Sequence, residues 1–278
     1  MSSYKNWYRP SITVTDTQTE FAMEFNLSAP TKLMPFIEAC DYTAKILYQE
    51  HKSLYLSLSG GQDSECVADV LIRNQIPFTP IIADIDNTRD HYYALDWCKS
   101  HDINPTIIHI DQNDQDFLAH CVILKKKYRV RIAGNMITSY LSNIVKNQGG
   151  VLVTGDPAIV GLTDSFYTPA GDMFDTNWFE FLPDIFNGNV CEFFFYTPEL
   201  ALSYATYIDT SLSYCKAKSE LYQVPYRPKY FPPPTPISKD MAIKLEHRLH
   251  PLSALPVVSS NNIWHKNDLI SILENKNV

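Results

Sequence analysis

Short apolar segments separated by helical patterns constrain the fold of this 278-residue chain more than any other feature. They lie at residues 54–58, 78–83, 106–110 and 151–153. The first three recur after about 25 residues, which is the spacing of βα units joined by right-handed crossovers. Each segment is apolar throughout, as expected of parallel strands that helices cover on both faces. The pattern therefore predicts an α/β fold built on a doubly wound parallel sheet.

Helical patterns fill the intervals between these segments, with apolar residues three or four positions apart. They cover residues 32–50, 64–73, 88–100, 113–127 and 136–147. Weak alternation over residues 11–26 predicts a hairpin ahead of them. Beyond residue 165, Thr197-Pro198-Glu199 has the cap, proline and early carboxylate of a helix start. Two further helical patterns lie at residues 239–248 and 266–275.

This distribution predicts three regions along the chain. Residues 1–50 form a hairpin and a helix that pack on the core, and residues 51–165 form the α/β domain. Residues 166–278 form a smaller, helix-rich region that we expect to act as a substrate-binding part or lid.

A polar segment, Ser59-Gly60-Gly61-Gln62-Asp63-Ser64, follows the first predicted strand, and we name it the glycine loop. Its glycines permit a sharp turn and a close approach of a ligand to the backbone. The N–H groups that follow lie at a helix N-terminus, where the helix dipole favours an anion. Asp63 would repel a bare phosphate, so its presence predicts a Mg²⁺ ion beside the ligand. The lysine of a Walker A loop is absent, which indicates another class of nucleotide site.

The glycine loop after an apolar strand resembles the S-G-G-x-D-S motif of PP-loop (N-type) ATP pyrophosphatases. That resemblance implies a Rossmann-like (HUP-type) doubly wound sheet that binds ATP and Mg²⁺. It implies that the whole glycine loop holds the pyrophosphate of ATP, and that the backbone near Leu58, Ile82 and Asp84 holds adenine and ribose. Stretches within residues 192–199 and 218–230 also resemble bacteriophage-encoded PP-loop proteins.

A second short motif, Val153-Thr154-Gly155-Asp156, ends the fourth predicted strand. It is similar to the second acidic motif of the PP-loop family, which implies that Gly155 lies at the nucleotide and that Asp156 joins Asp63 as a metal ligand. The carboxyl ends of parallel strands are where open α/β sheets bind ligands. The alternative for Asp156 is an ordinary turn residue before a proline.

The glycine loop contains no cation, yet a departing pyrophosphate needs its charge stabilised. The chain must therefore supply lysine or arginine from elsewhere. Four basic residues cluster in the C-terminal region, and we expect residues 190–230 to fold over the strand ends: Lys216, Lys218, Arg227 and Lys229. Lys218 and Arg227 are the predicted catalytic cations. The alternative for each of these residues is a surface charge.

The resemblance implies a reaction in which ATP gives AMP and pyrophosphate while a small-molecule, nucleotide or nucleobase substrate is adenylated. An amine or ammonia, free or from a separate partner, then displaces AMP. Two alternatives stay open on the same residues. One is a sulphonucleotide reductase or nucleotidyltransferase, against which the lack of a redox cysteine pair weighs. The other is a regulatory nucleotide-binding protein without catalysis. The residues do not decide whether the chain forms a homo-oligomer.

Composition narrows the partners and the compartment. The formal charge of −8 weighs against bulk binding of nucleic acid, and the basic cluster Lys125 to Arg131 is interpreted as a solvated helix end. None of the six cysteines forms a C-x-x-C pair, which argues against a zinc site. No signal-peptide pattern and no apolar run of about eighteen residues is visible. We therefore expect a cytoplasmic protein, in the host cytoplasm if a phage encodes it.

Overall fold

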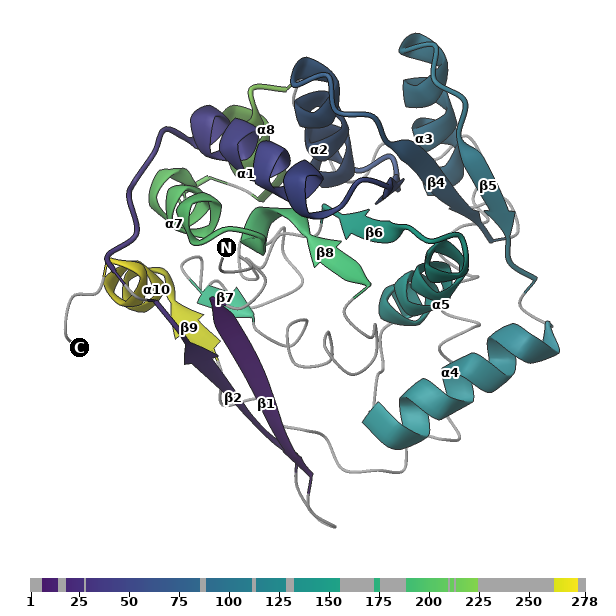
Figure 1. Ribbon diagram of the computed structural model, residues 1–278, viewed down its shortest axis with the longest axis horizontal. Helices are drawn as coiled ribbons and strands as arrows, with labels where there is room; N and C mark the ends of the chain where they lie inside the picture. Colours follow the sequence, from purple (N-terminus) through teal and green to yellow (C-terminus); the bar gives the residue numbers. More distant parts are fainter. Residues whose placement is uncertain are drawn as a thin grey trace.

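The computed structural model describes residues 7–14, 19–27, 29–85, 89–111, 114–128, 133–155, 173–175, 189–209, 211–212, 214–224 and 263–274. A five-stranded parallel sheet with the strand order β5-β4-β3-β6-β8 lies at its centre (Figure 1). The strands are β3 (Leu54–Ser57), β4 (Thr79–Asp84), β5 (Thr106–His109), β6 (Val151–Thr154) and β8 (Val190–Glu192). The first four coincide with the predicted apolar segments; β6 is buried throughout, while the edge strand β5 is partly exposed.

Helices precede and connect these strands. They are α1 (Phe36–Glu50), α2 (Gln62–Arg73), α3 (Arg89–Ser100), α4 (Gln115–Tyr128) and α5 (Ala133–Asn147). Figure 1 shows α1 and α2 on one side of the sheet and α5 on the other. The predicted α/β fold with a doubly wound parallel sheet is confirmed. No helix in the part of the chain that the structure describes is long and apolar enough to cross a membrane.

The order of the strands reverses beside β3. From β3 the chain moves to β4 and β5 on one side, then returns to place β6 on the other side of β3. Open α/β sheets bind their ligands at such a reversal, at the carboxyl ends of the strands. The glycine loop follows β3 and Gly155 follows β6, so both predicted motifs lie at the reversal.

The N-terminal hairpin consists of β1 (Tyr8–Val14) and β2 (Thr19–Phe25), which pair antiparallel as the alternation predicted. In Figure 1 the two strands of the hairpin run away from the parallel sheet. Its base is held by Trp7, which is buried and stacks on Phe195 with ring centroids 6.0 Å apart. The Trp7 Nε1–H donates a hydrogen bond of 3.0 Å to the Phe195 carbonyl oxygen.

The C-terminal region adds η3 (Phe193–Phe195), α7 (Pro198–Tyr207) and α8 (Tyr214–Tyr222). Side chains from all three belong to the same hydrophobic core as the sheet. A second antiparallel pair joins β7 (Met173–Asp175) to β9 (Ile263–His265), and α10 (Lys266–Leu273) follows where the last helical pattern lies. The helical pattern at residues 239–248 lies outside the described residues. The predicted boundary at residue 165 stays a prediction.

Thr197 fixes the start of α7 and ties it to α1. Its Oγ1 accepts a hydrogen bond of 3.3 Å from the Leu200 N–H and lies 2.6 Å from Thr43 Oγ1. Thr197→Ala should lower the free energy of unfolding by about 1–3 kcal/mol, because the cap is lost and the buried Thr43 hydroxyl loses this partner. Thr197→Ser keeps the oxygen and should lose less than half as much in urea denaturation. Equal losses in both variants would contradict this role.

Candidate active site

The glycine loop makes a tight turn between β3 and α2. Gly60 has a φ of 73°, in the left-handed region that glycine adopts without strain. Gly61 is the N-cap of α2 with φ −86° and ψ 156°, so its backbone is extended. No side chain caps the N-terminus of this helix by a hydrogen bond to its first N–H groups. Such a helix end favours an anion through its backbone donors and its dipole.

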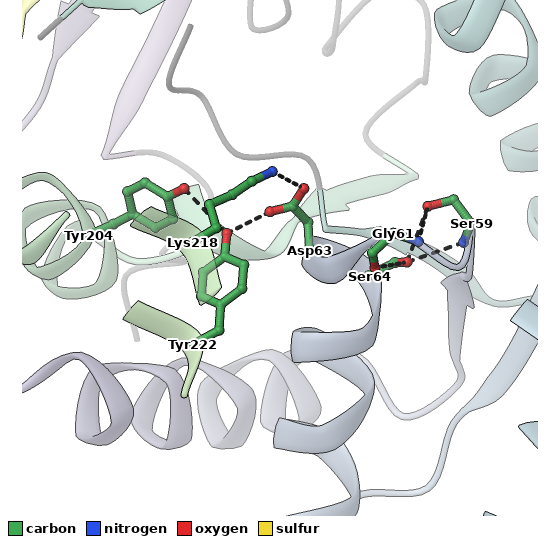
Figure 2. A network of polar contacts seen from close by, with 7 residues as sticks. All are labelled: Ser59, Gly61, Asp63, Ser64, Tyr204, Lys218 and Tyr222. Carbon is green, nitrogen blue, oxygen red and sulfur yellow. Dashed lines mark hydrogen bonds and ion pairs between the residues drawn. The ribbon is translucent and has the colours of Figure 1, made fainter. Parts of the chain in front are cut away.

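Hydrogen bonds between Ser59 and Ser64 hold the glycine loop in shape. The Ser64 hydroxyl donates to the Gly61 carbonyl oxygen at 3.1 Å and accepts from the Ser59 N–H at 3.2 Å. The two serine Oγ atoms are themselves 3.2 Å apart, and the Gly61 N–H donates to Ser59 Oγ at 3.4 Å (Figure 2). These bonds fix the path of the loop backbone between β3 and α2.

Gly155 packs directly against the start of α2. A Cβ at this position would lie 2.8 Å from the Asp63 carbonyl carbon, from its oxygen and from the Ser64 nitrogen. Any side chain would therefore overlap the backbone of the glycine loop. The two motifs, 91 positions apart between Ser64 and Gly155, form one surface in the folded chain.

The Asp63 carboxylate is bound by two side chains of α8. Lys218 Nζ forms an ion pair with Asp63 Oδ2, and the Tyr222 hydroxyl donates to Oδ1 at 2.6 Å. The Lys218 side chain is only 5% exposed and that of Asp63 21% exposed, so solvent screens the pair weakly. Figure 2 shows the carboxylate pointing toward α8, on the side away from Ser59 and Ser64.

Aromatic packing fixes the Tyr222 hydroxyl. The Tyr222 ring stacks on Phe194 at a centroid distance of 5.4 Å and on Phe36 at 5.8 Å. Burial and the negative charge of Asp63 raise the pKa of Tyr222 well above its usual range, so the phenol stays protonated. Its single proton is used toward Asp63, and Tyr204 Oη, 3.2 Å away, must therefore donate to Tyr222 Oη.

The residues expected at adenine and ribose lie at the ends of β3 and β4. Leu58 and Ile82 are each 1% exposed, and the Leu58 N–H already donates to the Ile81 carbonyl oxygen at 3.0 Å. The Asp84 carboxylate is bound at Oδ2 by His109 Nδ1, 2.7 Å away, while His91 Nδ1 lies 3.6 Å from Oδ1. The roles of Leu58, Ile82 and Asp84 toward a nucleotide stay predictions.

Magnesium would meet an unfavourable arrangement at Asp63 as the side chains stand. Mg²⁺ in phosphate sites takes one or two carboxylates along with phosphate oxygens and water. Here an ammonium group already lies on Asp63 Oδ2 and would repel a second cation. Among the described residues, no group of three or more His, Cys, Asp or Glu side chains could hold a metal ion. The donor set at Asp63 thus fits an ammonium group better than Mg²⁺.

The other predicted site residues divide between the described and the masked parts of the chain. Gln62 begins α2, and its Nε2 is buried without a hydrogen-bond partner in the described part of the chain. Lys216 is exposed on α8. Asp156, Arg227 and Lys229 lie outside the described residues.

Tyr204 was not predicted as a site residue, and Tyr222 was expected only as one of the aromatic residues that flank the C-terminal basic residues and exclude water. The signal for Tyr222 was its position four residues after Lys218, since residues four apart in a helix share one face. Once Lys218 was predicted to face the glycine loop, the same reasoning would have placed Tyr222 there. Tyr204 has no comparable signal, because α7 and α8 are joined by a turn of unpredicted geometry.

Comparison with known proteins adds little beyond these contacts. No protein-family model matches the chain, and no curated protein matches it. Among solved structures, the chain is similar to NMN synthetase from Francisella tularensis at 14% identity and a TM-score of 0.36. The match covers 81% of this chain and 98% of the other. Because the two structures overlay so loosely, the description of the fold and the site rests on the geometry of this chain alone.

Proposed function

We propose that the chain binds ATP at the glycine loop and splits it to AMP and pyrophosphate while adenylating a substrate. The observation that carries this proposal is the hydrogen-bonded glycine loop at the reversal of strand order, with an uncapped helix end on one side and the buried Lys218 charge nearby. Backbone donors and a cation in a site of low exposure are the groups that stabilise a departing phosphate chain.

In the proposed reaction, a carboxylate or carbonyl oxygen of the substrate attacks the α-phosphorus of ATP. A new O–P bond forms, and the bond to pyrophosphate breaks with its electron pair leaving on the pyrophosphate. An amine or ammonia then attacks the activated carbon, and AMP departs with the C–O electron pair while the nitrogen loses a proton. The glycine loop and Lys218 would hold and neutralise the pyrophosphate. Asp156 and Arg227 remain the predicted metal ligand and second cation.

The two alternative functions make different demands on the chain. A thiol-based reductase needs a reactive cysteine, and all six cysteines are buried. This burial favours adenylation over reduction. A regulatory binder would use the same loop without turnover.

The test is incubation of the chain with ATP, Mg²⁺ and pools of carboxylic acids, nucleobases and amines, read by ³¹P NMR. We expect AMP and pyrophosphate to appear in equal amounts, and only with the correct acceptor. ADP with inorganic phosphate would contradict the proposal. ATP binding in calorimetry with no product from any pool would favour the regulatory binder instead.

A further inference from the structure

We propose that Asp63 is the anchor of the Lys218 ammonium group, with Tyr222 holding Asp63 in place, and that Asp63 is not a ligand of magnesium. This inference rests on the proposed function, in which the Lys218 charge neutralises the pyrophosphate of ATP. Asp63 and Tyr222 are then positioning residues that act through Lys218. The inference departs from the sequence prediction, which assigned Asp63 to a metal.

The carboxylate geometry favours an anchor. Each Asp63 oxygen receives a different donor, the Lys218 ammonium at Oδ2 and the Tyr222 hydroxyl at Oδ1. Two donors in different directions fix both the position and the plane of a carboxylate. The carboxylate also points away from the serines that shape the glycine loop, as Figure 2 shows. A metal on Asp63 would have to displace the Lys218 ammonium group from Oδ2.

The support behind the carboxylate is rigid. Tyr222 packs against both the Phe36 and Phe194 rings, with interplanar angles of 19° and 7°, and these contacts hold its ring in place. Tyr204, 1% exposed, donates to Tyr222 from the other side. The donors thus run in one direction, from Tyr204 to Tyr222 to Asp63. This arrangement keeps the negative charge of Asp63 facing Lys218.

Lys218 needs such an anchor because its charge is buried. Lys218 is 4% exposed, and a charge taken out of water needs a charged partner and directed hydrogen bonds. Asp63 holds the lysine in place near the start of α2, where the surrounding protein shields it from solvent. An incoming polyphosphate then meets a cation that is already desolvated and oriented, which strengthens the attraction.

Calorimetry of ATP binding with magnesium and with EDTA separates the two roles. Asp63→Asn and Lys218→Met should each weaken ATP binding roughly tenfold, the fold-change of one charge-assisted hydrogen bond. The loss should be the same with and without magnesium, and the double variant should bind no more weakly than either single variant. A loss in Asp63→Asn that disappears in EDTA would show that Asp63 binds the metal and would overturn the proposal.

Two further variants separate positioning from general destabilisation. Tyr222→Phe should weaken ATP binding in the same magnesium-independent way, by less than Asp63→Asn, because one of two supports is lost. Thr43→Val removes a different buried hydroxyl bond, from α1 to Thr197, in which no residue of the glycine loop takes part. It should lower the unfolding midpoint while leaving ATP affinity unchanged. Equal effects of both variants on ATP affinity would count against Tyr222 as a positioning residue.

Amine labelling tests the anchor without any nucleotide. Acetic anhydride followed by peptide mass spectrometry compares Lys218 with Lys216, an exposed lysine on the same helix. Asp63→Asn should raise the labelling of Lys218 relative to Lys216 roughly tenfold. Unchanged relative labelling would overturn the anchor. Increased labelling in a chain that binds no ATP would overturn the proposed function alone.

Discussion

Replacing Gly155 by alanine should weaken ATP binding by about 100-fold, the cost that a displacement of about 1 Å imposes on an aligned site. The added Cβ would lie 2.8 Å from three backbone atoms of Asp63 and Ser64, none of which can rotate away. The start of α2 must therefore shift, and with it the N–H groups proposed to bind pyrophosphate. Overpacking of this kind should also lower the free energy of unfolding by about 1–3 kcal/mol. Calorimetry with ATP and urea denaturation measure the two effects.

Gly150→Ala is the matched control for this prediction. Its Cβ would lie 2.4 Å from the Tyr55 ring, an overlap as severe, but beside the first residue of β6 and not beside the glycine loop. This variant should lose stability by a similar amount while the folded fraction binds ATP normally. Normal ATP affinity in Gly155→Ala, or equal losses of affinity in both variants, would refute the link between Gly155 and the glycine loop.

Raising the pH above about 9 should destabilise the fold steeply, by up to about 4 kcal/mol per pH unit. Burial raises the pKa of the Cys40 and Cys66 thiols above the usual range, and that of Cys121 to about 11. Between the unfolded pKa of about 8.5 and these raised values, the folded chain keeps three protons that the unfolded chain releases. Because the unfolded state binds fewer protons, stability falls as the pH rises, by about 1.4 kcal/mol per unit for each thiol.

Urea denaturation at pH 7.5, 9 and 10 would measure this slope. Cys121→Ala should reduce it by about 1.4 kcal/mol per pH unit while leaving the urea m-value unchanged. The loss should be fully reversible when the pH is returned to neutrality in the presence of a reductant. A free energy of unfolding that stays constant from pH 8 to 10 would show that the thiols ionise as easily in the folded chain.

The fold could be predicted because its signals are local. Strands buried on both faces must be apolar throughout, and four such segments stand out. Helix ends also carry local chemistry, as Thr197 and Pro198 show at the start of α7. Gly149, with a φ of 74°, follows the end of α5, where glycine commonly terminates a helix. The fifth strand, β8, is only three residues long and runs directly into a 3-10 helix, so no strand period is visible there.

The candidate site was predictable in part for the same reason. The glycine loop is contiguous, so its turn and its helix end follow from neighbouring residues. Lys218 could be predicted as the cation because an anion site without a cation is incomplete. The partner of Lys218 could not be predicted, because it depends on how α8 packs against α2. That His91 and His109 lie beside Asp84 could not be predicted from the sequence either, because it depends on strand register.

The contact between Asp63 and Lys218 joins residues separated by 155 positions, and this has a consequence for how the protein matures. Ser59 to Ser64 can adopt their turn as soon as α2 forms, because their bonds are local. The lysine arrives only after the ribosome has added the intervening segment, about 8–30 s later at ordinary elongation rates. A nascent or truncated chain ending before α8 would therefore display a shaped loop in which the negative charge of Asp63 has lost its Lys218 partner. Nucleotide affinity would then report on completion of the whole chain, and a separately expressed 51–165 fragment should be a poor ATP binder.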